Sequence, residues 1–245
     1  MISKLYQRAK YTPFGDRALK VEFGNIISPD VNARVHALHD AITHAQLSGV
    51  SECVPTYCSL LITYDPEKVT YDELVTKVNN LEEMPKANAP KRKKRKAVLP
   101  VVYGGDFGPD LAQVSQYHNL KEGDIVRIHS QQEYLVYMIG FIAGFPYLGK
   151  LPKEIATPRL ETPRLRVPEG SVGIAESQTG IYPKQAPGGW QIIGRTPIRL
   201  FDSLWHPPAL LQPGDVVSFR PISAEEFWQI MASTAERRYN PFVTE

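Results

Sequence analysis

The first 85 residues alternate between the two-residue hydrophobic period of strands and the longer period of helices. Residues 18–23 alternate apolar and polar side chains, and residues 57–64 form a second apolar-rich run. Both patterns are typical of strands. After each run, apolar side chains recur every three or four residues, as on one helix face: Val31, Val35, Leu38, Ile42 and Ala45, then Leu74, Val78 and Leu81. This order predicts a small N-terminal α/β domain of β-α-β-α type at residues 1–85.

Both expected helices are preceded by residues that favour helix initiation. Ser28 is a suitable N-cap residue, and Pro29 follows it at the first helical position. Thr70 and Glu73 form a capping box, in which each side chain can bond the backbone N–H of the other residue. We expect Gly49 to end the first helix.

Beyond residue 98 the pattern changes to short β-branched or aromatic runs separated by Gly, Pro and Asp. The runs cover residues 98–102, 125–129, 134–139, 171–175, 190–194 and 216–219. Closely spaced strands with such turns favour a barrel or a sandwich. A helical pattern interrupts them at residues 110–117, and a capping box of Ser223 and Glu226 opens a last helix. We therefore predict a β-rich domain with a C-terminal helix at residues 98–245.

A basic segment separates the two predicted domains. The formal net charge of the chain is +2, and the six cationic residues 91–96 contribute +6, so the remainder carries −4. This balance argues against a nucleic-acid surface along the chain. A block of like charge without periodicity is typical of a solvated linker, here residues 86–97. A nuclear-localisation or polyanion-binding role is the alternative.

The remaining composition indicates a cytoplasmic protein. The N-terminus lacks the apolar core of a signal peptide, and the longest uncharged run, residues 134–149, is too short and too broken to cross a membrane. Two cysteines cannot form a disulfide framework. Cys53 and Cys58 are five positions apart in what looks like one strand, which would place them on opposite faces.

Residues 144–150, Gly-Phe-Pro-Tyr-Leu-Gly-Lys, resemble a phosphate-binding P-loop that lacks its last residue. A P-loop needs Ser or Thr next and then a helix, but Leu151 and Pro152 follow here. The interior of the loop is also stiffened by Phe145, Pro146 and Tyr147. The sequence therefore offers no recognisable nucleotide-binding motif.

Three arginines follow within a short distance and could bind an anion. Arg159 and Arg164 each follow a proline, which restricts the backbone around them, and Arg166 is close by. Guanidinium groups bind carboxylates and phosphates with two parallel hydrogen bonds. The alternative is that these arginines form surface ion pairs with nearby carboxylates, namely Glu154, Glu161 or Glu169.

A second cluster of turn residues carries Tyr182 and Trp190 at residues 180–183 and 187–190. It suits either a pocket wall or a barrel corner. The histidines indicate no chemistry. His36, Asp40 and His44 line one side of the first helix without further ligands, as on a solvated helix face. We expect His129, alone at the end of a strand, to be a hydrogen-bonded structural histidine, and we predict no metal site.

The motifs of residues 140–197 carry a family resemblance. They read GFxxGFPYLGxLP, then PRxxxPRxxVPxGSVGIA, then QTGIYPxxxPGGWxxIGRTP. This succession resembles the family of 5-oxoprolinase B subunits (PxpB), which includes the histidine-kinase inhibitor KipI and is related to the allophanate hydrolase subunit 1 domain. Residues 14–19 and 54–61 resemble two N-terminal strands of that family. Ala143 replaces a proline of the family pattern.

The resemblance implies an α+β fold, with a small N-terminal α/β domain followed by a cyclophilin-like β-barrel domain. It implies the B subunit of an ATP-dependent 5-oxoprolinase that opens 5-oxoproline to L-glutamate together with C and A subunits, and that is inactive alone. ATP and Mg²⁺ would then act at the level of the complex. The alternatives are a KipI-like inhibitor that binds a sensor histidine kinase, and a carboxyltransferase or allophanate hydrolase-type domain.

With that substrate, which carries a carboxylate, an anion site is expected at the arginines. We predict anion contacts from Arg159, Arg164 and Arg166. We predict a pocket wall of eight further residues: Phe145, Tyr147, Gln178, Tyr182, Gly188, Gly189, Trp190 and Arg195. The sequence identifies no catalytic residue.

Overall fold

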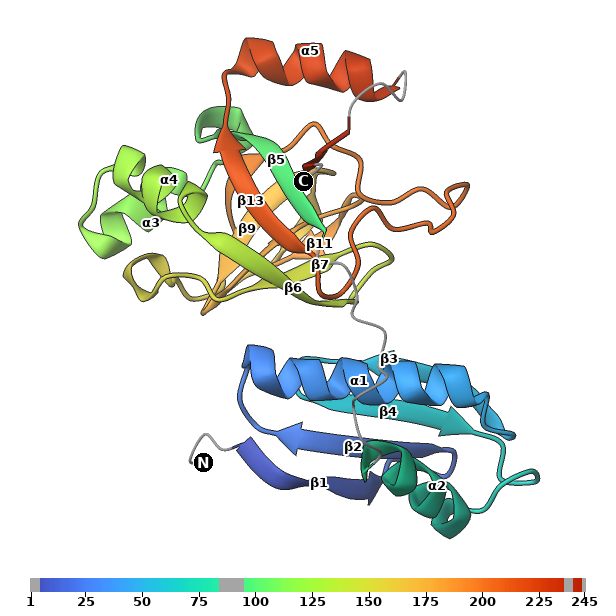
Figure 1. The fold of residues 1–245 in the computed structure, drawn as a ribbon. Coiled ribbons are helices and arrows are strands. Elements are labelled where there is room, and N and C mark those ends of the chain that lie inside the picture. The colour runs from blue at the N-terminus through green and yellow to red at the C-terminus, as the bar shows by residue number, and fades with distance from the viewer. Residues whose placement is uncertain (1–4, 84–94, 236–239, 244–245) are drawn as a thin grey trace. The chain divides into compact units, whose positions relative to one another are not determined.

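The computed structural model describes residues 5–83, 95–235 and 240–243 (Figure 1). The chain divides into two compact units, residues 1–92 and residues 93–245. Each unit has its own hydrophobic core. The predicted α+β class is confirmed, because helices accompany an antiparallel sheet in the first unit and a closed barrel in the second.

The N-terminal unit is a four-stranded antiparallel sheet with two helices packed on one face (Figure 1). Its strands lie in the order β1-β2-β4-β3, and its elements are β1 (Leu5–Pro13), β2 (Ala18–Gly24), α1 (Pro29–Ala45), β3 (Val50–Pro55), β4 (Ser59–Tyr64) and α2 (Tyr71–Glu83). Alternate residues of the central strands, such as Val21 and Ile62, are fully buried against the helices. The predicted β-α-β-α order was therefore incomplete, since it lacked the two edge strands β1 and β3.

The predicted start of α2 is confirmed, whereas the predicted end of α1 is not. The capping box of α2 is present, because Glu73 Oε2 accepts the Thr70 N–H at 3.0 Å and Thr70 Oγ1 accepts the Glu73 N–H at 3.4 Å. The prediction that Gly49 ends α1 is wrong. Gln46 ends it in the left-handed conformation, with φ of 45°, and Gly49 instead forms the turn into β3 with φ of +87°.

The two cysteines do not share one strand. Cys53 lies on β3, and Cys58 lies in the turn before β4. The prediction that they occupy opposite faces of a single strand is therefore wrong. Both are free thiols.

The C-terminal unit is a closed seven-stranded barrel. Going round it, the strands are β12 (Gln191–Arg195), β9 (Ser171–Ala175), β10 (Gln178–Ile181), β7 (Pro146–Gly149), β6 (Glu133–Ile139), β13 (Val216–Pro221) and β5 (Lys96–Tyr103). The pairing of β5 with β12 closes the ring, and β14 (Phe242–Val243) adds to β5. Neighbouring strands are antiparallel except β5 and β13. The predicted β-barrel is confirmed.

Helices and a small ribbon surround the barrel (Figure 1). The helices are α3 (Leu111–His118), α4 (Glu122–Ser130) and α5 (Ala224–Ala235), with short 3₁₀ turns η2 (Gly105–Phe107) and η3 (Lys153–Ile155). Strands β8 (Arg164–Val167) and β11 (Ala186–Gly188) pair as a separate two-stranded ribbon. At the start of α5, Ser223 Oγ accepts the Glu226 N–H at 3.1 Å, which is one of the two bonds of the predicted capping box. The Glu226 side chain does not return the second bond but accepts from Nη2 of Arg220 at 2.7 Å.

Residues 125–129 were predicted as a strand but lie in α4. Ile125 and His129, one helical turn apart, are both fully buried. Three β-branched residues in a five-residue run resemble a strand, and here the burial of one helix face outweighs that local preference. The other helical pattern of this region, residues 110–117, is confirmed as α3.

The basic run 91–96 is only partly described. Residues 91–94 lie outside the described residues, whereas Arg95 and Lys96 belong to the barrel unit. Arg95 pairs with the buried Asp215 at 2.5 Å, and Lys96 pairs with Glu133. Among the described residues, no helix has the length and apolar character that crossing a membrane requires.

Candidate functional site

The segment that resembles a P-loop does not form one. From residue 146 the chain runs as strand β7, and the next helical turn is the short η3 at Lys153–Ile155. Gly144 has φ of +86°, and a Cβ there would lie 2.5 Å from Cβ of Phe201. The segment is thus a packed turn and strand without a helix N-terminus, and it does not fit the phosphates of a nucleotide.

Four predicted wall residues form an aromatic cluster on the barrel. Phe145 is at its centre, with its ring centroid 4.9 Å from that of Tyr147, 5.1 Å from that of Tyr182 and 5.4 Å from that of Trp190. The rings of Tyr182 and Trp190 meet Phe145 edge to face, an arrangement that stabilises aromatic pairs. We call Phe145, Tyr147, Tyr182 and Trp190 the aromatic wall.

Arg164 is held by a carboxylate that the sequence did not single out. Its Nη2 lies 2.5 Å from Oδ1 of Asp110, which is 4% exposed. Oδ2 of the same aspartate accepts the N–H of Ile192 at 2.6 Å. The charge of Arg164 is therefore balanced inside the protein by Asp110, which lies 54 positions away in sequence. None of the nearby glutamates considered as its partner has this role.

Arg159 and Arg166 have exposed side chains, and neither makes a hydrogen bond or ion pair within the described residues. Of the two, Arg159 lies beside the aromatic wall. Burial is the main effect on the hydroxyl of Tyr182 and raises its pKa to about 12, while the charge of Arg159 lowers it. The pKa of Tyr147 is likewise raised by burial and lowered by Arg159. The charge of Arg159, which has no ion pair within the described residues, thus acts on two tyrosines of the aromatic wall.

The backbone on both sides of Arg159 is fixed. The carbonyl oxygen of Pro158 accepts a hydrogen bond from Nε2 of Gln191 at 2.9 Å. The N–H of Leu160 donates to the carbonyl oxygen of Gly189 at 2.7 Å. Arg159 therefore projects from a loop that is attached to the residues following β11.

Gly188 is needed next to the aromatic wall for a steric reason. A Cβ on Gly188 would lie 2.1 Å from the hydroxyl oxygen of Tyr182, so no side chain fits there. Gly189 is different, because its Cβ would have no heavy atom nearer than 3.6 Å. Of the other predicted wall residues, Arg195 donates to the carbonyl oxygen of Glu169 at 2.7 Å, and Gln178 opens β10 opposite Ala175.

His129 lies in α4 and not at the end of a strand, but its structural role is as predicted. Thr179 Oγ1 donates to the carbonyl oxygen of Gly173, so it accepts from Nε2 of His129 at 3.0 Å. Nδ1 then accepts from the hydroxyl of Tyr103 at 2.8 Å. Burial lowers the pKa of His129 to about 3. The imidazole is neutral and fully bonded inside the barrel unit.

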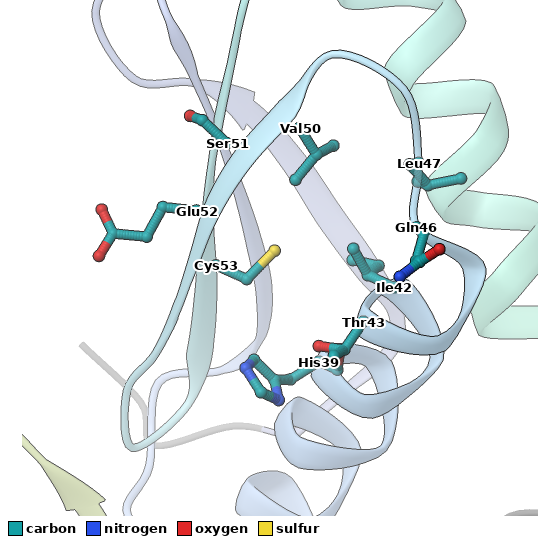
Figure 2. Close-up of a pocket in the computed structure, with 9 residues that line it drawn as sticks. All are labelled: His39, Ile42, Thr43, Gln46, Leu47, Val50, Ser51, Glu52 and Cys53. Atoms are coloured by element: carbon teal, nitrogen blue, oxygen red, sulfur yellow. The ribbon is translucent and has the colours of Figure 1, made fainter. Parts of the chain in front are cut away.

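A separate hollow of about 360 Å³ lies between α1 and β3 in the N-terminal unit (Figure 2). It is lined by His39, Ile42, Thr43, Gln46, Leu47, Val50, Ser51, Glu52 and Cys53. Burial and the charge of Glu52 raise the pKa of the Cys53 thiol to about 11, so it is a poor nucleophile at neutral pH. Among the residues that the structure describes, no group of three potential ligands could hold a metal ion.

The sequence missed Asp110 and Gln191 as members of the site. Asp110 contacts Arg164 across 54 positions of the sequence, and Gln191 contacts Pro158 across 33. No local sequence pattern predicts contacts over such separations. The available signal for Gln191 was that it is a polar residue in the otherwise apolar run 190–194.

Comparison with known proteins places the chain in a family. The sequence profile described as "Carboxyltransferase domain, subdomain C and D" matches residues 9–211. The chain is 41% identical to the 5-oxoprolinase B subunit of Bacillus subtilis, over 90% of this chain and 95% of that protein. It is 40% identical to the 5-oxoprolinase B subunit of Escherichia coli O157:H7, over 88% and 97% respectively.

Longer proteins contain a similar segment. The crystal structure of the protein TTHA0988 superimposes with a TM-score of 0.75 and 34% identity, covering 85% of this chain and 40% of that one. Urea amidolyase of Saccharomyces cerevisiae is 26% identical over 92% of this chain and 14% of its own length. This chain thus spans less than half of those proteins, but nearly all of the two bacterial 5-oxoprolinase components. It belongs to the family of 5-oxoprolinase B subunits, among the carboxyltransferase-type domains.

Proposed function

We propose that this chain is the B subunit of an ATP-dependent 5-oxoprolinase that cleaves 5-oxoproline to L-glutamate. The near full-length similarity to two proteins of that name supports the assignment. The proposal includes partner C and A subunits, without which the chain is inactive. ATP and Mg²⁺ are assigned to the complex, because residues 144–151 do not fit a nucleotide. Two free thiols are consistent with a cytoplasmic complex.

The observation that carries this proposal is the uncommitted guanidinium of Arg159 beside the aromatic wall. 5-Oxoproline has a carboxylate and a planar lactam ring. An arginine fork binds a carboxylate with two hydrogen bonds, and aromatic side chains provide apolar faces for a small ring. Arg164 suits this task less, because Asp110 already neutralises it.

The residues around Arg159 are suited to binding and orienting a substrate. Tyr182 remains a neutral phenol at physiological pH, since burial raises its pKa to about 12. It can donate a hydrogen bond but is a poor general base. In this proposal the chain supplies the carboxylate contact and the apolar wall.

The proposal is tested by reconstitution. The chain is co-purified with candidate A and C subunits, and 5-oxoproline-dependent ATP hydrolysis and glutamate release are measured with and without it. Full activity without this chain would refute the proposed assignment. Because a hydrogen bond to a charged group contributes about 1.5–3 kcal/mol, Arg159→Ala should raise KM roughly 10- to 150-fold.

Arg166→Ala is the matched control for Arg159→Ala. Arg166 is also exposed and without an ion pair in the described residues, but it lies on β8. We expect the complex that carries Arg166→Ala to have a KM for 5-oxoproline within about twofold of that of the unaltered complex. Equal effects of the two substitutions would show that Arg159 has no special role in substrate binding.

A carboxyltransferase-type activity is the second candidate. It is favoured by the carboxyltransferase profile over residues 9–211 and by the similarity to urea amidolyase. Replacing 5-oxoproline by urea in the same reconstituted assay separates the two candidates. Urea-dependent ATP hydrolysis without 5-oxoproline-dependent hydrolysis would favour the second.

A further inference from the structure

The loop that carries Arg159 is attached to the barrel unit at three points. Gln191 donates to the carbonyl oxygen of Pro158, just before Arg159, and Leu160, just after it, donates to Gly189. At the other end of the loop, Asp110 holds Arg164. Arg159 has no partner of its own among the described residues, so the place of its guanidinium depends on the backbone that these contacts fix.

Two of these attachments contain a buried polar atom without a partner. Oε1 of Gln191 and Nη1 of Arg164 are both inaccessible to solvent and make no hydrogen bond within the described residues. Burying an unsatisfied polar atom costs free energy. Apolar side chains of similar shape often stabilise a fold as well as buried polar ones do or better. Stability alone therefore does not explain a polar residue at 191 or an ion pair between residues 110 and 164.

We propose that Gln191 and Asp110 are positioning residues for substrate binding, which act by fixing the loop of residues 158–164 so that Arg159 meets the substrate carboxylate. This rests on the proposed function, since the carboxylate is that of 5-oxoproline. Gln191 fixes the near end of the loop through Pro158, and Asp110 fixes the far end through Arg164. The same aspartate accepts the Ile192 N–H, so both attachments meet on β12.

Gln191 is the better residue to test, because its side chain contacts the loop without an ion pair. Gln191→Met keeps length and approximate volume but removes the donor to Pro158. Gln131→Met is the matched control, since Gln131 is an exposed glutamine after α4. The first readout uses the isolated chain and needs no activity. Amide hydrogen exchange at Leu160 should accelerate at least tenfold in Gln191→Met and stay unchanged in Gln131→Met.

The second readout is a double-mutant cycle in the reconstituted complex. Gln191→Met should raise KM for 5-oxoproline about tenfold, with kcat within about twofold. In the Arg159→Ala background it should raise KM no further, because the residue on which it acts is absent. Asp110→Asn should behave in the same way. A substitution that merely weakens the fold would lower activity in both backgrounds.

The outcomes separate the two proposals. An inactive unaltered complex would refute the 5-oxoprolinase assignment, while exchange at Leu160 would still show whether Gln191 fixes the loop. Unchanged exchange at Leu160 in Gln191→Met overturns the inference. So does a rise in KM that persists undiminished when Arg159 is already alanine.

Discussion

Gly188 and Gly189 are adjacent, yet the structure predicts opposite results when each becomes alanine. A Cβ on Gly188 would lie 2.1 Å from the hydroxyl oxygen of Tyr182, whereas ordinary contacts begin at 3.4 Å. The two groups would have to separate by about 1.3 Å. Tyr182 cannot yield easily, because it is 1% exposed and its ring packs against Phe145. On Gly189 the nearest atom would be at 3.6 Å, so alanine fits.

The expected cost follows from this geometry. Overpacking a well-packed region typically costs about 1–3 kcal/mol. Neither partner of the clash can move freely, because Gly188 pairs with Arg164 and Tyr182 packs in the aromatic wall. We therefore expect Gly188→Ala to lower the free energy of unfolding by about 2–3 kcal/mol. Gly189→Ala should change the free energy of unfolding by less than about 0.5 kcal/mol.

Tryptophan fluorescence during urea unfolding measures this difference in the barrel unit, where both glycines lie. All three tryptophans, Trp190, Trp205 and Trp228, lie in residues 93–245, so their fluorescence reports the barrel unit. With a urea dependence of about 2 kcal/mol/M, Gly188→Ala should lower the midpoint by about 1 M or slightly more. Equal midpoints for the Gly188 and Gly189 variants would refute the steric argument.

Three further predictions concern stability. Since burial lowers the pKa of His129 to about 3, this imidazole gains a proton between about pH 6.5 and pH 3 only when the chain is unfolded. By urea unfolding, its contribution to the free energy of unfolding should be about 2 kcal/mol smaller at pH 5 than at neutral pH, and His129→Gln should reduce the pH dependence by that amount. Asp110→Ala should lower the free energy of unfolding by roughly 3 kcal/mol, because it leaves the charge of Arg164 without a partner. Urea unfolding followed by tryptophan fluorescence measures this, and an unchanged urea midpoint would contradict it. Thr70→Ala should lower the free energy of unfolding by about 1 kcal/mol, because it removes the N-cap of α2. Unfolding followed by circular dichroism measures this, and Thr76→Ala in the middle of α2 is the control that should not show the loss.

The features that the sequence predicted well are local ones. The capping boxes at Thr70 and Ser223 depend on residues three positions apart. The structure contains both bonds of the first and only the Ser223 half of the second. Strand β2 was recognised because it is central and its alternate residues are buried. Strand β1 was not, because it is an edge strand whose side chains are exposed or only half-buried, so alternation in its sequence is weak.

What the sequence could not predict depends on distant contacts. The arginines at 159, 164 and 166 look alike in sequence, since each lies in the same proline-rich segment. Only Asp110, which the fold brings to Arg164, distinguishes a neutralised arginine from an uncommitted one. Similarly, residues 125–129 are β-branched enough to resemble a strand, and only packing against the barrel core decides for a helix.

The pairing of β5 also determines the order in which the barrel can be completed during synthesis. Residues 96–101 pair with residues 216–221, which leave the ribosome 120 positions later. At about 5–20 residues per second, β5 waits roughly 6–24 s for β13. Its apolar residues, Leu99 and Val101 among them, lack this partner in the interval. Because unpaired apolar strands aggregate, nascent chains interrupted before residue 221 should need chaperones more than the finished protein does.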